Sequence, residues 1–137
     1  TSIYEGTTQM QVVAAIRYAT SGFYSDMMNE YASQPIASKW ELLRNELVEA
    51  QGVYQQALDS VLATNNQAMI DWHGRRLVEM AGYIIMGHLL LQDACANETL
   101  FEKSAKTFIR WTVAQVKQHA SFIERSQVDD MADYRFS

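Results

Sequence analysis

The chain is 137 residues long, which suits one domain large enough to bury a core. Hydrophobic residues make up 48% and charged residues 20%, a balance typical of a folded globular protein and not of a disordered one. The net charge is −5 and no run of Lys or Arg occurs, which argues against a nucleic-acid partner. One proline and six glycines favour helices, because sheet proteins need more turn residues.

Cys95 is the only cysteine, which excludes an internal disulfide and a metal site built from several cysteines. Its place in a helical pattern predicts a small buried side chain. No apolar run is long enough to cross a bilayer and no segment resembles a signal peptide, so we expect a cytoplasmic protein. Association with a membrane surface stays open but has no support.

The first predicted helix runs from about residue 8 to residue 21. Thr8 followed by Gln11 has the spacing of a capping box, and Gly22 is a plausible stop. The stretch 23–38 could extend this helix until Pro35 breaks it, so we place the main boundary of the chain at that proline.

The second predicted helix, residues 38–64, has the clearest period, and Ser38 with Glu41 predicts its N-cap. Its apolar residues recur at three- and four-residue steps, as in the seam of a bundle: Trp40, Leu43, Leu47, Ala50, Tyr54, Ala57 and Val61. Thr-Asn-Asn-Gln at 64–67 predicts a short turn to the next helix.

The third predicted helix, residues 66–96, is apolar nearly all round in its second half, which favours a central position. Its small residues would let neighbouring helices approach closely: Gly74, Ala81, Gly82 and Gly87. The fourth predicted helix, residues 97–127, begins at Asn97 as N-cap. Its predicted buried stripe consists of Leu100, Phe101, Phe108, Trp111, Gln115 and Phe122.

Long helices joined by short turns must alternate in direction. The predicted fold is therefore all-α: an up-and-down bundle of three long helices plus an N-terminal helix, similar to a four-helix bundle. A carboxylate-bridged di-iron site is excluded, because no Glu stands three residues before His73, His88 or His119. We expect all three histidines to be structural and predict no metal site.

The segment Ile3 to Gln11 carries the most specific pattern in the chain. It resembles the signature at the end of the catalytic region of acyl-CoA dehydrogenases, which reads Ile-Tyr-Glu-Gly-Thr, a variable residue, then Gln-Ile-Gln. The matching residues are Ile3, Tyr4, Glu5, Gly6, Thr7, Gln9 and Gln11. Met10 replaces Ile conservatively, and Arg17 stands where the family has an arginine in the following helix.

The resemblance implies a role for each residue of this segment. Glu5 is the catalytic base that removes the α-proton of an acyl-CoA thioester, and Gly6 lets the chain pass close to the substrate. Thr7, Thr8 and Gln9 match the stretch that contacts FAD, with Thr8 at a variable position. Arg17 is expected to bind substrate, with a subunit contact or an exposed surface as the alternatives. Without the surrounding motif, Glu5 would be a solvated acid of a first helical turn.

The resemblance also implies a domain organisation. Residues 1–35 would be the tail of the catalytic helical domain, and residues 36–137 an accessory C-terminal bundle like that of a subset of the family. The expected parent is an FAD-dependent flavoenzyme of fatty-acid oxidation that uses acyl-CoA and an electron-transfer acceptor. We expect the bundle to serve structure or homo-oligomerisation, and the fragment alone to be inactive and not to bind FAD. The alternative is a free-standing, non-enzymatic helical interaction module.

Overall fold

The computed structural model describes residues 13–126, and this part contains helices and connecting turns but no strand. Residues 13–20 are helical. The elements that follow are α2 (Phe23–Ala32), the 3-10 turn η1 (Ser38–Trp40), α3 (Glu41–Leu62), α4 (Gln67–Ala96) and α5 (Glu98–Arg125). The all-α prediction is confirmed.

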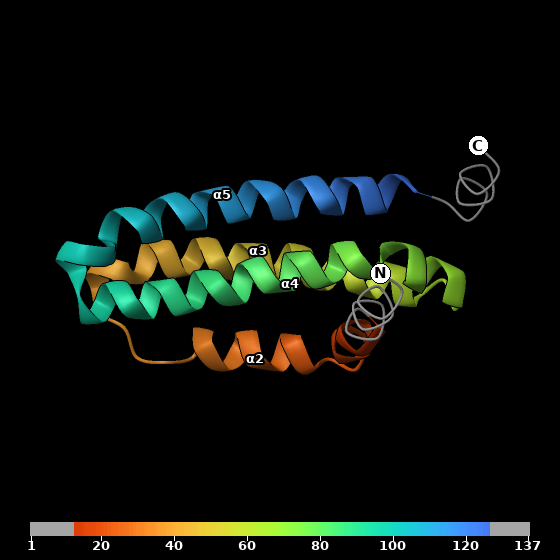
Figure 1. Ribbon diagram of the computed structural model, residues 1–137, viewed down its shortest axis with the longest axis horizontal. Helices are drawn as coiled ribbons and strands as arrows, with labels where there is room; N and C mark the ends of the chain where they lie inside the picture. The colour runs from red at the N-terminus through yellow and green to blue at the C-terminus, as the bar shows by residue number, and fades with distance from the viewer. Residues whose placement is uncertain (1–12, 127–137) are drawn as a thin grey trace, which may run out of the picture.

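The three long helices run up, down and up, as expected for helices joined by short turns (Figure 1). α4 packs against α3, α5 and α2, but α3 likewise packs against α2, α4 and α5. The central position predicted for α4 is therefore shared with α3. In the view of Figure 1, α4 lies in front of α3, with α5 on one side and α2 on the other. No other element of the described part covers the front of α4 in this view.

A left-handed joint separates the helix of residues 13–20 from α2. Gly22 has φ of 87°, a conformation that glycine adopts without steric cost, so the predicted stop at this residue is confirmed. α2 is therefore a separate helix and not an extension of the first. It ends before Pro35, and Met28 on its inner face is buried with Tyr54 and Leu77.

The predicted seam of α3 is confirmed. Every residue of the seam is buried, and Leu47, Ala50, Tyr54 and Ala57 are fully so. The core has two parts. One lies around Tyr54, Met80 and Ile84, and the other lies nearer the α4–α5 turn, around Trp40 and Leu91.

Two of the three glycines predicted to give α4 small faces do allow close approach. A Cβ on Gly74 would lie 2.5 Å from Cδ1 of Ile16, and one on Gly87 would lie 2.6 Å from Cδ2 of Leu47. A Cβ on Gly82 would meet no atom within 4 Å, so no neighbour within the described chain needs that space.

The predicted stripe of α5 is wrong in register. Leu100 is 65% exposed, and Trp111 and Phe122 are 44% and 40% exposed. The residues that face the core are smaller: Ala105, Ile109, Thr112, Val116, Ala120 and Ile123. Because α5 lies close against α3 and α4, its inner face takes compact side chains and the aromatic residues lie along the edges.

Of the predicted N-caps, Asn97 is confirmed, Ser38 is wrong, and the capping box at Thr8 lies outside the described residues. Asn97 caps α5 by accepting a hydrogen bond from the Leu100 amide at 3.2 Å, and Asn66 accepts from the Ala68 and Met69 amides to cap α4. Ser38 is not an N-cap, because it begins the 3-10 turn that leads into α3 and its side chain makes no capping bond. Cys95 was predicted to be buried, but it is exposed near the end of α4.

Candidate functional site

The residues predicted to carry the chemistry lie at the N-terminal end of the chain. Glu5, Gly6, Thr7, Thr8 and Gln9 fall outside the described residues, and their roles stay predictions. Arg17 is described: its side chain is exposed, and its carbonyl accepts hydrogen bonds from the Ser21 amide at 2.9 Å and the Thr20 hydroxyl at 3.2 Å.

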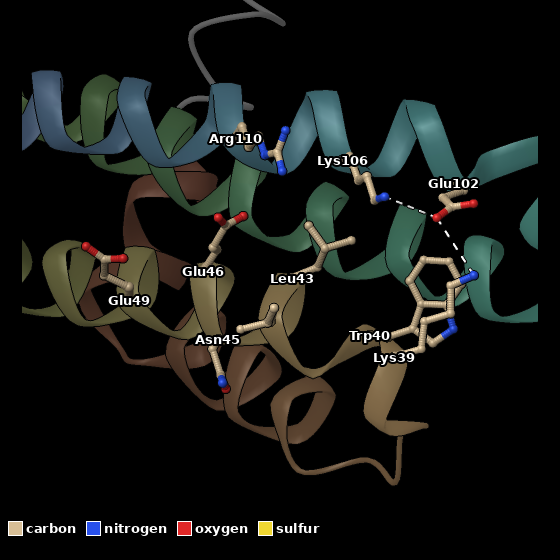
Figure 2. A pocket seen from close by; sticks show the side chains of 10 residues that line it. Lys39, Trp40, Leu43, Asn45, Glu46, Glu49, Glu102, Lys106 and Arg110 are labelled. Atoms are coloured by element: carbon tan, nitrogen blue, oxygen red, sulfur yellow. Dashed lines mark ion pairs between the residues drawn. The ribbon is translucent and has the colours of Figure 1, made fainter.

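A groove of about 520 Å³ lies between α3 and α5 (Figure 2). Trp40 and Leu43 contribute apolar surface, and charged side chains of both signs line the rest: Lys39, Glu46, Glu49, Glu102, Lys106 and Arg110. Lys106 pairs with Glu102 at 3.1 Å, and Lys39 lies 3.8 Å from the same carboxylate. The hydrogen bond from Lys106 is the main cause that lowers the pKa of Glu102.

The charges of this groove largely neutralise one another. Lys39 also pairs with Glu98, and Glu49 pairs with Lys117 at 2.8 Å. Glu46 has a buried carboxylate oxygen without a hydrogen-bond partner in the described part, and Figure 2 shows the side chain extending from α3 towards α5. Of the three cations that line the groove, Lys39 and Lys106 are ion-paired, and Arg110 has no ion pair within the described residues. Three carboxylates share the lining with these cations, so the groove does not indicate a site for the phosphates of a coenzyme.

A second candidate is a pocket of about 150 Å³ between α2, α3 and α4, where His88 is buried. The Nε2 atom of His88 lies 2.5 Å from Oε1 of Gln51, and Gln51 donates through Nε2 to Asn29 at 3.5 Å. Tyr31 stacks on the imidazole with the ring centres 5.8 Å apart. A carbonyl oxygen can only accept, so Nε2 of His88 carries the proton and Nδ1 is left as an acceptor.

Burial keeps the imidazole of His88 neutral. Desolvation, followed by the charge of Arg44, lowers the pKa of His88 to about 4. The pocket is smaller than the 300–1,000 Å³ typical of sites for drug-sized ligands. The arrangement is therefore a satisfied polar cluster within the core, in agreement with the structural role expected for this histidine.

His73 is the other buried histidine, and it differs from His88 in having no hydrogen bond. Both ring nitrogens are buried without a partner in the described part. The ring lies against Trp72 and Phe122, with centres 4.6 and 6.0 Å apart, and Arg76 lies over the Phe122 ring at 4.2 Å. Desolvation, followed by the charge of Arg76, lowers the pKa of His73 to about 4.

The third candidate is the outward face of α4 and α5, where large apolar side chains are exposed. Met86 is 56% exposed and Leu89 43% exposed on α4, while Trp111 of α5 packs edge-on against Tyr83 at 4.9 Å. Beside Trp111 a shallow hollow of about 680 Å³ is lined by Leu90 and Phe108. Trp111 is exposed and Phe108 is half-buried, although both belong to the predicted buried stripe of α5.

Within residues 13–126, no group of three or more His, Cys, Asp and Glu side chains is placed to hold a metal ion. No helix in that range combines the length and the apolar character that a membrane span requires.

Comparison with known proteins identifies the family. A crystal structure of an acyl-CoA dehydrogenase family protein from Porphyromonas gingivalis has a similar fold, with a TM-score of 0.78 and 26% sequence identity. The match covers 83% of this chain and 98% of the solved one. No curated protein matches the sequence. Residues 20–131 match the family described as acyl-CoA dehydrogenase C terminal, so they span the whole bundle from α2 to α5. The chain therefore belongs to the acyl-CoA dehydrogenase C-terminal family.

Proposed function

We propose that this chain is the C-terminal portion of an FAD-dependent acyl-CoA dehydrogenase that oxidises acyl-CoA thioesters in the cytoplasm. The observation that carries the proposal is the combination of the motif at residues 3–11 with the family match over residues 20–131. The two are independent, because the motif lies outside the matched range. Residues 1–35 would complete the catalytic helical domain, and residues 36–137 would form the accessory bundle.

In this proposal Glu5 is the base. A carboxylate removes a weakly acidic C–H proton only when it is held within reach of that proton and kept from water. The backbone N–H of Glu5 would donate to the thioester carbonyl, where negative charge develops as the α-proton leaves. Gly6 would let the backbone approach the substrate, and Arg17 would bind it.

Thr7, Thr8 and Gln9 would hold FAD through hydrogen-bond donors at the start of a helix. When bound, FAD would supply an acceptor for the hydride that leaves the β-carbon. The described part of the chain offers no comparable site, since the pocket beside His88 is small, the groove between α3 and α5 carries as many carboxylates as cations, and the hollow beside Trp111 is shallow. The bundle would thus serve structure and homo-oligomerisation, and the chain alone would be inactive.

Substitution Glu5→Gln in the complete enzyme tests the role of the base. We expect kcat for acyl-CoA oxidation to fall about 10²- to 10⁴-fold, the usual contribution of a general base. Flavin absorbance should be unchanged, because the amide has nearly the same shape. Glu41→Gln is the matched control, since Glu41 is also an acid of a first helical turn but is exposed on α3.

The fragment itself gives a second readout for the same proposal. The isolated 137-residue chain should neither bind FAD nor oxidise an acyl-CoA. Stoichiometric flavin binding by this chain, or full activity of the Glu5→Gln enzyme, would contradict the assignment. A free-standing interaction module would lack flavin in the complete protein as well.

A further inference from the structure

We infer that the outward stripe of α4 is a two-fold interface with a second copy of this chain. This rests on the homo-oligomerisation role of the proposed function and names the surface and the partner. The stripe is built from residues at helical spacing, none of which is buried: Arg75, Glu79, Gly82, Met86, Leu89 and Asp93.

The composition of this face is that of an interface core. Between Glu79 and Asp93, α4 has no Asp, Glu, Lys or Arg, and its one histidine there, His88, is buried. The exposed side chains in the middle are Met86 and Leu89. Interface cores are depleted in charge and enriched in Met and aromatic residues, whereas an ordinary surface helix would alternate charges here.

An aromatic anchor flanks the stripe on the α5 side. Trp111 is 44% exposed, and Tyr83 and Phe108 hold its ring from two sides, with centres 4.9 and 5.8 Å away. Exposed and already fixed in position, Trp111 has the properties of a binding hot spot.

The stripe is complementary to itself at its ends and around its centre, while Glu79, which lies 3.5 Å from Nε2 of His119, faces Leu89 of the second copy between them. In an antiparallel pair of identical helices related by a two-fold axis, a residue faces the one equally far on the other side of the centre. With the centre at position 84, Arg75 faces Asp93 of the second copy, which joins opposite charges at both ends. Gly82 faces Met86 of the second copy. The most exposed large apolar side chain of α4 therefore lies opposite a glycine, which has no side chain to obstruct it.

Gly82 is compatible with this pairing. A Cβ at this position would meet nothing within 4 Å, so the fold of the described chain does not need a glycine there. In mid-helix a glycine is about 1 kcal/mol less favourable than alanine. The room above its backbone is what a methionine from a second copy would fill.

The size of the surface places it among small interfaces, which include many weak and transient ones. From Arg75 to Asp93 the stripe spans about 27 Å at a rise of 1.5 Å per residue, and α4 with α5 is about 20 Å wide. Such a patch buries roughly 1,000 Å² over both copies, near the lower limit for specific interfaces. We therefore expect dissociation in the micromolar range.

Analytical ultracentrifugation of the 137-residue chain at about 1 to 300 µM covers concentrations below and above the expected dissociation constant. The chain should shift from monomer to dimer across this range. Gly82→Gln should weaken the dimer at least tenfold while leaving the monomer folded, because it fills the open space. Gly52→Gln is the matched control: a Cβ on Gly52 would also meet nothing within 4 Å, and this residue lies in mid-helix on α3, so its substitution should not affect association.

Charge exchange tests the register of the pairing. Arg75→Asp and Asp93→Arg should each weaken the dimer several-fold, because each places like charges opposite one another at both ends. The double variant should restore it, since both pairs are rebuilt in reverse. A double variant no better than the single ones, or a Gly82→Gln variant that dimerises normally, overturns this interface but leaves the oligomerisation role in place.

A chain that stays monomeric at the highest concentration overturns both the interface and the oligomerisation role. It leaves the Glu5 assay untouched, since that assay measures oxidation by the complete enzyme. The two proposals therefore fail separately.

Discussion

The two buried histidines show how much the environment of one residue decides. Both have their pKa lowered to about 4 by burial, but within residues 13–126 only His88 has a hydrogen-bond partner. The sequence predicted structural histidines and could not separate the two cases, because the partner of His88 is Gln51, 37 residues away on another helix. Such a pairing depends on how α3 and α4 pack, which residue types alone do not specify.

The same substitution should therefore have opposite effects at the two sites. His88→Phe should cost about 1–3 kcal/mol of unfolding free energy, because it leaves the buried Oε1 of Gln51 without a donor. His73→Phe should be neutral or stabilising, because it replaces two unpartnered nitrogens with apolar atoms of similar shape. Urea unfolding at about pH 8, where a free imidazole is neutral, measures both. Equal losses would contradict the difference in hydrogen bonding.

At the scale of the elements, the glycines of α3 and α4 offer a matched comparison. Gly52→Ala should stabilise the chain by about 0.5–1 kcal/mol, because the position is helical and open. Gly87→Ala should destabilise it by about 1–3 kcal/mol, because the new methyl group would lie 2.6 Å from the buried side chain of Leu47. Thermal unfolding of dilute protein measures both changes: the melting temperature should rise for Gly52→Ala and fall for Gly87→Ala. A stabilised Gly87→Ala variant would show that Leu47 has room to move.

The helices themselves could be predicted well from their periodicity, and α3 is the clearest case. The seam from Trp40 to Val61 was found because its residues are large and regularly spaced. The prediction of the buried face of α5 was wrong because the same reasoning favours large side chains. The inner face of this helix includes small residues such as Ala105, Thr112 and Ala120. Small residues mark a close helix contact only after the neighbouring helices are known. The prediction of Ser38 as an N-cap was wrong for a similar reason. Serine suits the start of a 3-10 turn as well as an N-cap, so its residue type does not distinguish the two.

At the scale of the whole molecule, the buried histidines make stability depend on pH. The imidazoles titrate near 6.5 when unfolded and near 4 when folded, so the unfolded chain binds more protons between these values. The unfolding free energy is highest above about pH 6.5 and falls as the pH is lowered towards 4, because protonation then favours the unfolded chain. Each histidine accounts for a decrease on the order of 3 kcal/mol across this window.

Urea unfolding from pH 8 to pH 4.5 checks this dependence. The unfolding free energy should decline steeply below pH 6.5. The His73→Phe variant should lose about half of the slope, since one of the two titrating sites is gone. A flat profile would mean that the imidazoles gain partners or solvent when they are protonated.

The prediction of the candidate catalytic site rests on its motif alone. Glu5 and its neighbours owe their assignment to a sequence pattern, whereas the outward face of α4 emerges only when α2, α3 and α5 are placed around it. Periodicity indicates that a helix is apolar all round. It does not say which side is left uncovered, because that depends on the neighbours in space.

The left-handed joint at Gly22 also affects whatever precedes the bundle. Two torsion angles at this residue set the direction in which the helix of residues 13–20 leaves α2. The packing of Ile16 against Gly74 also holds this helix in place. Most other residues adopt this torsion less readily, so a substitution at position 22 would change the direction in which residues 13–20 leave α2. Ala19, which is buried, and Ile16, which lies against Gly74, would then lose their present packing. One backbone torsion therefore controls both the direction of the N-terminal helix and part of the stability of the core.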